Sequence, residues 1–228
     1  MEILGVTKSA VEYLREKIIT GELRPGQKLN EAELSTTLGI SRPPLREAFR
    51  TLDELQLVVT IPRKGCVVAE ISVEAFTDLY QAREMIECYA IDLLNEKGVT
   101  ALPQAEAALK KTYHLSLPPA EDQRKRLDYL NAFAEFHYKL VESAGNRQLA
   151  YFYRTIGFSL ARYQFMYVYI PGLTRDSKAD HRKLLDLISI SRYQEAKEFL
   201  RNHIHSFVGI VKSKMKADKD SLLAASAL

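Results

Sequence analysis

Three arginines spaced four residues apart are the first feature with chemical meaning. Arg42, Arg46 and Arg50 occupy positions i, i+4 and i+8, and a helix brings such positions onto one face. An arginine row near the start of a helix suits phosphate contacts and paired hydrogen bonds to guanine. The spacing therefore predicts a DNA-reading helix face. The acidic residues Glu47 and 53–54 leave a second interpretation open, in which the arginines form an ordinary solvated surface.

A short basic segment downstream extends this predicted face. Arg63, Lys64 and Gly65 stand at the tip of an expected hairpin. Basic side chains there reach a neighbouring groove or phosphates, and glycine allows close approach of the backbone. Ser41, at the start of the arginine helix, completes the predicted DNA-binding set.

The five histidines all lie at or after residue 114, and three of them fall in separate expected helices. Neutral imidazoles of His137, His181 and His203 that project into a helical bundle would bind Zn²⁺, Ni²⁺ or a similar divalent metal. Hydrogen-bonded core histidines are the alternative. His205 is expected on the far side of its helix from His203, and His114 is expected at the surface.

The elements that position the arginines form a predicted winged helix-turn-helix in residues 1–72. Its expected parts are helices 11–19, 31–38 and 41–55 and hairpin strands 57–61 and 66–71. Asn30 and Gly39 delimit the middle helix, because asparagine caps helix N-termini and glycine ends helices. Pro43 and Pro44 mark the start of the third helix, where prolines are tolerated.

The histidines belong to residues 73–228, which are predicted to form an antiparallel helical bundle, so the fold class is mainly α. The expected helices cover residues 73–96, 103–115, 120–143, 147–169, 174–189 and 193–216. Glycine, proline and asparagine separate them, and no strand-like alternation appears between them.

The composition agrees with an ordinary globular chain. It has 228 residues, of which 46% are hydrophobic and 27% charged, and its net charge is only +3. A chain of this length buries a core without disulfides or metals, and its two cysteines form no CxxC motif. The N-terminal sequence lacks the apolar run of a signal peptide or a membrane span. We expect a cytoplasmic protein that does not associate with membranes.

The N-terminal segment resembles the DNA-binding domain of GntR-type bacterial transcription regulators. The resemblance covers residues 10–72 and rests on the segments GELRPGQKL, SRPPLREAFRTL and PRKGCVV. It implies that Arg42 and Arg46 read bases or phosphates and that Gly65 lies at the wing tip. The family commonly has a further basic contact in the preceding helix, and the matching residue here is Ala32.

The second half resembles the helical effector domain of the FadR subfamily, called FCD. The matching segments are QAREMIECYAIDLL, AEFHYKLVESAGNRQL, DHRKLLDLISI and EAKEFLRNHI. The resemblance implies a metal held by His137, His181 and His203, although Phe133 stands where the family usually has an aspartate ligand. It also implies that Arg83 grips an effector carboxylate, whereas the residues alone suggest an ion pair between Arg83 and Glu87.

The combined expectation is a homodimeric regulator that binds a DNA operator and a small organic acid, with repression more usual in such families. A metal-free effector-responsive regulator is an alternative. A metal-dependent hydrolase or oxygenase is a further one, but it leaves the DNA-binding segment unexplained. It is also disfavoured because neither His137 nor His203 has an acidic residue on its own helix face.

Overall fold

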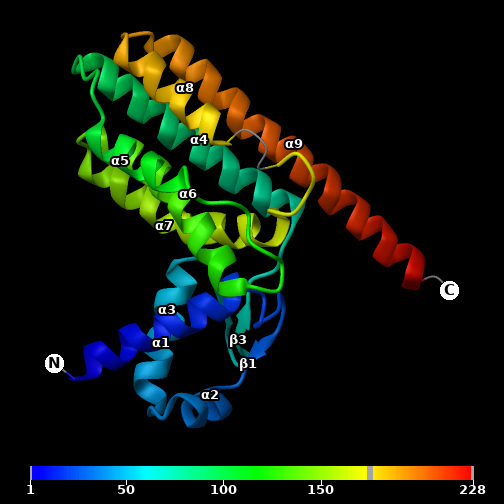
Figure 1. Ribbon diagram of the computed structural model, residues 1–228. Coiled ribbons are helices and arrows are strands. Elements are labelled where there is room, and N and C mark those ends of the chain that lie inside the picture. Colours follow the sequence, from blue (N-terminus) through cyan, green and yellow to red (C-terminus); the bar gives the residue numbers. More distant parts are fainter. Residues whose placement is uncertain (1, 174–176, 227–228) are drawn as a thin grey trace. The chain divides into compact units, whose positions relative to one another are not determined.

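The computed structural model describes residues 2–173 and 177–226, and it contains two compact units. The first unit is the chain up to Ile71 together with Phe158–Met166, and the second is Ser72–Gly157 with the chain from Tyr167 onward. Figure 1 traces these elements in colours that follow the sequence. The first division falls beside the predicted boundary at residue 72. The assignment of Phe158–Met166 to the first unit was not predicted.

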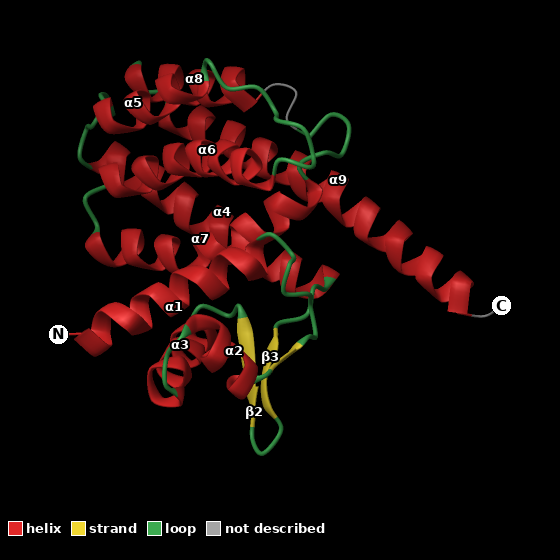
Figure 2. Ribbon diagram, turned by 60° about the horizontal axis from the view of Figure 1, so that its bottom comes forward, coloured by secondary structure: helices red, strands yellow, loops and turns green. Residues whose placement is uncertain are grey.

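The first unit has the expected order of a winged helix-turn-helix. Its elements are α1 (Glu2–Ile19), β1 (Lys28–Leu29), α2 (Glu31–Leu38), α3 (Arg42–Glu54), β2 (Val58–Ile61) and β3 (Gly65–Val68). Figure 2 shows the helices in red and the small sheet in yellow. Helix α1 begins well before the predicted residue 11. Strand β1 was missed because two residues are too few for a periodic pattern.

Helix α2 has the bounds that its end residues predict. The Asn30 side chain accepts hydrogen bonds from the backbone N–H groups of Ala32 and Glu33, at 3.0 and 3.4 Å. At the other end, Gly39 has φ of +64°, a left-handed conformation that favours glycine. This turn leads directly into α3.

Helix α3 has one apolar face that is packed into the core of the first unit. The buried residues on this face are Pro44, Leu45, Ala48, Phe49 and Leu52. Pro43 and Pro44 lie in the first turn, where a missing N–H group costs no intrahelical hydrogen bond. Burial of this face leaves the arginine positions of α3 exposed.

The sheet is antiparallel with strand order β1-β3-β2. Cys66, which is buried, pairs with Leu29 on one side and Thr60 on the other. The β2–β3 turn forms the wing. Arg63 in this turn has φ of +66°, which is uncommon for a residue with a side chain.

The second half of α7 (Arg147–Tyr167) completes the first unit. Phe158 packs against the apolar core of that unit. The Ser159 hydroxyl donates to the Leu55 carbonyl at 3.2 Å, and Arg162 donates to the Ala69 carbonyl at 2.7 Å. Since Arg162 is buried, its hydrogen bond to Ala69 supplies an acceptor that solvent would otherwise provide.

The second unit is entirely helical within the described ranges. Besides the first part of α7, it contains α4 (Val73–Glu96), α5 (Pro103–Thr112), α6 (Gln123–Ser143), α8 (Ser177–Ser189) and α9 (Tyr193–Ser226). These helices match the six predicted ones to within a few residues, except that α9 extends further. The predicted start of the fifth, at 174–176, lies outside the described residues. No described helix is long and apolar enough to cross a membrane.

Helix α4 lies at the centre of this unit, where it packs against α6 and α9. The Ser72 hydroxyl caps α4 by accepting from the Ala75 N–H at 3.0 Å. Phe76, Tyr80 and Ile91 on α4 are buried. Helices α6, α8 and α9 each carry one of the three predicted metal ligands.

Candidate functional site

The three predicted histidine ligands meet inside the second unit. His137 comes from α6, His181 from α8 and His203 from α9. Ring nitrogens of the three lie within 4.8 Å of one another. His137 and His181 are buried, whereas His203 is partly exposed. Residues that are 44 and 22 positions apart in the sequence therefore form one cluster.

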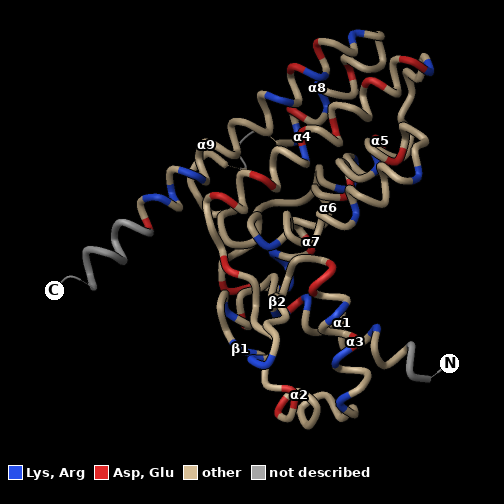
Figure 3. Tube along the Cα trace, turned by 180° about the vertical axis from the view of Figure 1, so that it is seen from behind, with Lys and Arg blue, Asp and Glu red and all other residues tan. Residues whose placement is uncertain are grey.

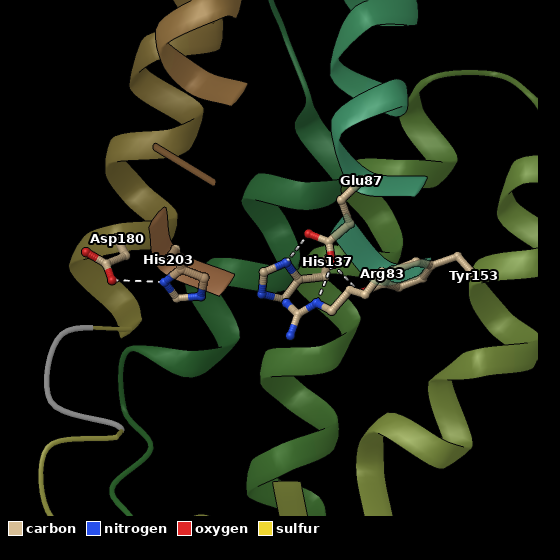
Figure 4. A network of polar contacts seen from close by, with 6 residues as sticks. All are labelled: Arg83, Glu87, His137, Tyr153, Asp180 and His203. Atoms are coloured by element: carbon tan, nitrogen blue, oxygen red, sulfur yellow. Dashed lines mark hydrogen bonds and ion pairs between the residues drawn. The ribbon is translucent and has the colours of Figure 1, made fainter. Parts of the chain in front are cut away.

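Carboxylates from other helices orient two of these rings (Figure 4). His137 Nδ1 lies 2.8 Å from Glu87 Oε2, and His203 Nδ1 lies 3.0 Å from Asp180 Oδ2. Each carboxylate acts as an acceptor, which places the ring proton on Nδ1 and leaves Nε2 as the free ligand atom. The sequence-based argument considered acidic residues on each histidine's own helix face, whereas these two carboxylates come from α4 and α8.

His181 differs from the other two histidines in the surroundings of its ring nitrogens. Both Nδ1 and Nε2 are buried, and neither has a hydrogen-bond partner among the described residues. The ring stacks on Phe136 at 4.3 Å and meets His137 edge-on at 4.6 Å, measured between ring centroids. A buried imidazole costs free energy unless its polar atoms find a partner, so this geometry points to a ligand.

A buried ion pair adjoins the cluster. Arg83 Nε lies 2.6 Å from Glu87 Oε1, and the exposed fractions of the two side chains are 4% and 0%. Glu87 also accepts from the Tyr153 hydroxyl at 2.7 Å. The ion pair between Arg83 and Glu87 that the residues suggested is therefore present. The effector contact of Arg83 stays a prediction, and the position of Arg83 beside the histidines is compatible with it. Within the described residues, the terminal Nη groups of Arg83 make no hydrogen bond.

The ionisation states of these side chains follow from their burial. Burial lowers the pKa of His137 to about 4, although the field of Glu87 opposes this shift. Burial also lowers the pKa of His181, and the fields of His137 and His203 add to the effect. Burial alone would raise the pKa of Glu87, but Arg83 and then His137 hold it below its ordinary value. Near pH 7 the buried His137 and His181 are thus neutral imidazoles, which are the metal-binding form, beside an ionised Glu87.

The donor set fits a divalent metal that takes nitrogen ligands, because the three nitrogens converge and no described residue hydrogen-bonds to those of His181. Two nitrogens on one tetrahedral zinc lie about 3.3 Å apart, given Zn–N bonds of about 2.0–2.1 Å. The cluster, at 4.8 Å or less, would have to contract modestly. Phe133 contributes only an aromatic ring, 6.0 Å from the ring of His181 between centroids, so this position offers no carboxylate ligand.

The remaining histidines lie outside this cluster. His205 is 61% exposed and contacts Glu84, with 2.7 Å between His205 Nε2 and Glu84 Oε2. His114 is exposed. These positions match the orientations expected from the sequence.

The arginine face of α3 is exposed, and its members have different surroundings. Arg46 Nε lies 3.0 Å from Glu31 Oε2 of α2. Arg50 lies 3.9 Å from both Glu47 and Glu54. Figure 3 shows acidic segments beside basic ones in α2 and α3. Arg42 makes no ion pair within the part of the chain that the structure describes.

The other predicted DNA-binding residues are also accessible. Arg63, Lys64 and Gly65 are exposed at the β2–β3 turn. Ser41 precedes α3, and its side chain makes no capping hydrogen bond. An exposed arginine row on the second helix of a helix-turn-helix, beside a basic wing, is an arrangement that enters a DNA groove.

The comparison with protein families identifies both units. Residues 6–68 match the family described as "Bacterial regulatory proteins, gntR family", and residues 78–206 match the FCD domain. This chain is a GntR-type transcriptional regulator with an FCD domain. It is not an enzyme, since the family and the similar proteins are regulators.

Similar proteins support the assignment of this chain to the GntR regulators with an FCD domain. It is 24% identical to the HTH-type transcriptional regulator YdhC of Bacillus subtilis, over 91% of this chain and 92% of that protein. It is 25% identical to the HTH-type transcriptional repressor GlaR of Escherichia coli, over 89% and 94% of the two chains. A GntR regulator structure from Rhodococcus sp. RHA1 shares the fold, with a TM-score of 0.70 and 22% identity over 90% of this chain and 96% of that one.

Sequence reasoning missed three residues of the histidine site of the GntR/FCD regulator. Glu87 was noticed only as a partner of Arg83, and Asp180 and Tyr153 were not assigned to the site. Tyr153 and Glu87 are 66 positions apart, and His137 and Glu87 are 50 apart. Only the adjacency of Asp180 to His181, which puts a carboxylate beside a candidate ligand, offered a signal in the sequence.

Proposed function

We propose that this regulator is a repressor that binds operator DNA as a homodimer and responds to a small carboxylate effector held beside the histidine cluster. The observation that carries the effector part is the convergence of His137, His181 and His203 next to Arg83. His137 and His181 are buried there, and neither nitrogen of His181 has a hydrogen-bond partner among the described residues. The repressor role is supported by two similar proteins of Escherichia coli, GlaR and RspR, which are named as transcriptional repressors. Because such a repressor acts on bacterial chromosomal DNA, the proposal includes a cytoplasmic location.

The DNA part of the proposal assigns direct contacts to the first unit. Arg42, Arg46 and Arg50 would face the major groove, while Arg63, Lys64 and Gly65 of the wing and Ser41 would contact the backbone or an adjacent groove. A two-fold symmetric dimer would present this face twice and so read two half-sites of a palindrome.

The metal part of the proposal assigns Nε2 of His137 and of His203, with one nitrogen of His181, as ligands of Zn²⁺ or Ni²⁺. Such an ion supplies positive charge and open coordination positions, which attract a carboxylate. The Nδ1 contacts with Glu87 and Asp180 would fix the two ring orientations.

Arg83 is proposed as the second group that holds the effector. Glu87 fixes its guanidinium through Nε, and the Nη groups remain as donors for a carboxylate. Effector binding would change the fraction of protein in the DNA-binding conformation only if the effector has different affinities for that conformation and for another one.

A metal-free pocket is the second candidate, and the position of Phe133 favours it. All three converging ligands are imidazoles, and Phe133 adds no negative charge to offset that of a divalent ion. In this case the histidines and Arg83 would bind the carboxylate through hydrogen bonds.

Elemental analysis of untagged protein, purified without chelator, separates the two candidates. Wild type is compared with His181→Ala and with the control His205→Ala, whose exposed side chain lies outside the cluster. About one zinc or nickel per chain in wild type and in the control, and none in His181→Ala, would support the metal site. Absence of metal from all three proteins would refute it and favour the metal-free pocket.

The effector is then sought by thermal shift with small carboxylates. We expect the stabilising compounds to lose their effect in Arg83→Ala and, if they act through the metal, in His181→Ala as well. Retention of the shift in Arg83→Ala would exclude Arg83 as the effector-binding group.

A further inference from the structure

The ion pair between α2 and α3 involves one of the proposed DNA-reading arginines. Glu31 is the first residue of α2, and its Oε2 atom lies 3.0 Å from Arg46 Nε. The side chains are 34% and 65% exposed, so the pair lies in solvent at the surface of the helix-turn-helix. Its contribution to folding is correspondingly small.

The geometry of this contact matters more than its contribution to stability. Glu31 accepts from Nε, while both Nη groups of Arg46 remain outside that hydrogen bond. A guanidinium is planar, so fixing Nε restricts the direction of the two Nη groups. The Nη groups are donors that can bind the O6 and N7 acceptors of guanine.

The other two arginines are not held in this way. Arg50 contacts Glu47 and Glu54 of its own helix, at the longer distance of 3.9 Å in both cases. Arg42 has no ion pair within the described ranges. Arg46 is therefore the member of the row that a carboxylate from a second helix positions.

We propose that Glu31 is a specificity-determining residue that makes Arg46 a base reader and disfavours its use as a phosphate contact. The proposal rests on the DNA-binding face proposed above. Glu31 restricts Arg46 before DNA arrives, which reduces the entropy lost on binding. Its negative charge also repels phosphates near Arg46, so sequence-independent binding is weakened more than base contact.

The test is selection of a random-sequence DNA duplex library by the full-length protein at fixed salt. Arg46→Ala identifies the base positions that Arg46 reads, because the wild-type preference of about tenfold or more at those positions should fall to about twofold or less. Glu31→Ala should weaken the preference at the same positions by about threefold or more, with equal or higher affinity for random duplex. Glu31→Gln keeps an oxygen acceptor and should restore part of the preference.

Two controls separate positioning from a charge effect. Glu33→Ala removes the same charge from the first turn of α2, where Glu33 is exposed, so it should raise random-duplex affinity without changing base preference. In an Arg46→Ala background, Glu31→Ala should cause no further loss of preference. Circular dichroism and thermal unfolding check that every variant is folded.

The outcomes discriminate between this inference and the proposed DNA face. Wild-type base preference in Glu31→Ala, together with loss in Arg46→Ala, would overturn the role of Glu31 alone. Unchanged preference in Arg46→Ala would overturn Arg46 as a reader and this inference with it. An equal loss in Glu33→Ala would show a general charge effect and would also overturn the positioning role.

Discussion

The two units contain the same kind of contact, arginine with glutamate, in opposite environments. Arg83 and Glu87 of the second unit are 4% and 0% exposed, whereas Arg46 and Glu31 of the first are 65% and 34% exposed. The N–O distances are similar, at 2.6 and 3.0 Å. The distance between the charged atoms therefore does not by itself tell how much an ion pair contributes to stability, because burial sets the cost of breaking it.

The buried pair is part of a network in which both carboxylate oxygens of Glu87 accept hydrogen bonds. Glu87 lies against Arg83, His137 and Tyr153, and loss of any partner leaves a charge or a donor inside the protein. The exposed pair keeps its groups hydrated, so loss of either partner leaves no buried charge. The comparison predicts a graded series of mutational effects.

The largest effect is expected for Glu87→Ala. This change leaves the Arg83 charge buried without its counterion, which should lower the free energy of unfolding by about 3–5 kcal/mol. Urea denaturation measures the change. Glu84→Ala is the matched control, because Glu84 lies on the same helix and pairs with Arg201 and His205 nearer the surface, so about 1 kcal/mol or less is expected. Equal effects of the two substitutions would contradict the distinction between buried and exposed pairs.

A smaller effect is expected for Tyr153→Phe, which removes one hydrogen bond to the buried carboxylate. Hydrogen bonds to charged groups contribute about 1.5–3 kcal/mol, and denaturation of the variant measures the loss. Tyr151→Phe on the same helix is the control, since Tyr151 is 63% exposed and should change stability by about 0.5 kcal/mol or less. A neutral Tyr153→Phe would mean that Glu87 finds another donor.

Asp180→Ala tests the polar surroundings of the cluster without removing a proposed ligand. Loss of the carboxylate beside His203 Nδ1 should weaken zinc affinity about tenfold, or about 1.4 kcal/mol. Competition titration with a chromogenic chelator gives the affinity. Asp186→Ala, on the same helix but paired with Arg182, serves as the control and should bind zinc as wild type does. Wild-type affinity in Asp180→Ala would contradict an orienting role.

The smallest effect on folding is expected for Arg46→Ala. The exposed pair with Glu31 should contribute about 0.5 kcal/mol or less to the free energy of unfolding. DNA affinity, measured by titration at fixed salt, should nevertheless fall, which separates the two properties within one variant. A large loss of stability would place Arg46 in the same class as Arg83.

The elements of the first unit were predictable where local chemistry determines them. Asn30 and Gly39 correctly predicted where α2 begins and ends, because helix capping and left-handed turns depend on a few adjacent residues. Strand β1 was not predicted, since it exists only through its pairing with β3. The left-handed conformation of Arg63 also had no signal in its residue type.

The histidine site was also predictable only in part, because some of its contacts are local in the sequence and others depend on tertiary packing. The three histidines were found from their places in helices and from a family resemblance. The contact of Glu87 with His137 depends on how α4 packs against α6, which no periodicity within one helix contains. Residues that orient a site through tertiary contacts are therefore harder to predict than its ligands.

The burial of both cysteines has a consequence for how the protein senses its surroundings. Cys66 lies in β3 and Cys88 in α4, and burial raises the pKa of each thiol to about 11. At pH 7 only about one thiol in 10,000 is then a reactive thiolate. Thiol-directed oxidants and alkylating agents should therefore leave both cysteines of the folded regulator unmodified, which makes them poor sensors of a redox change.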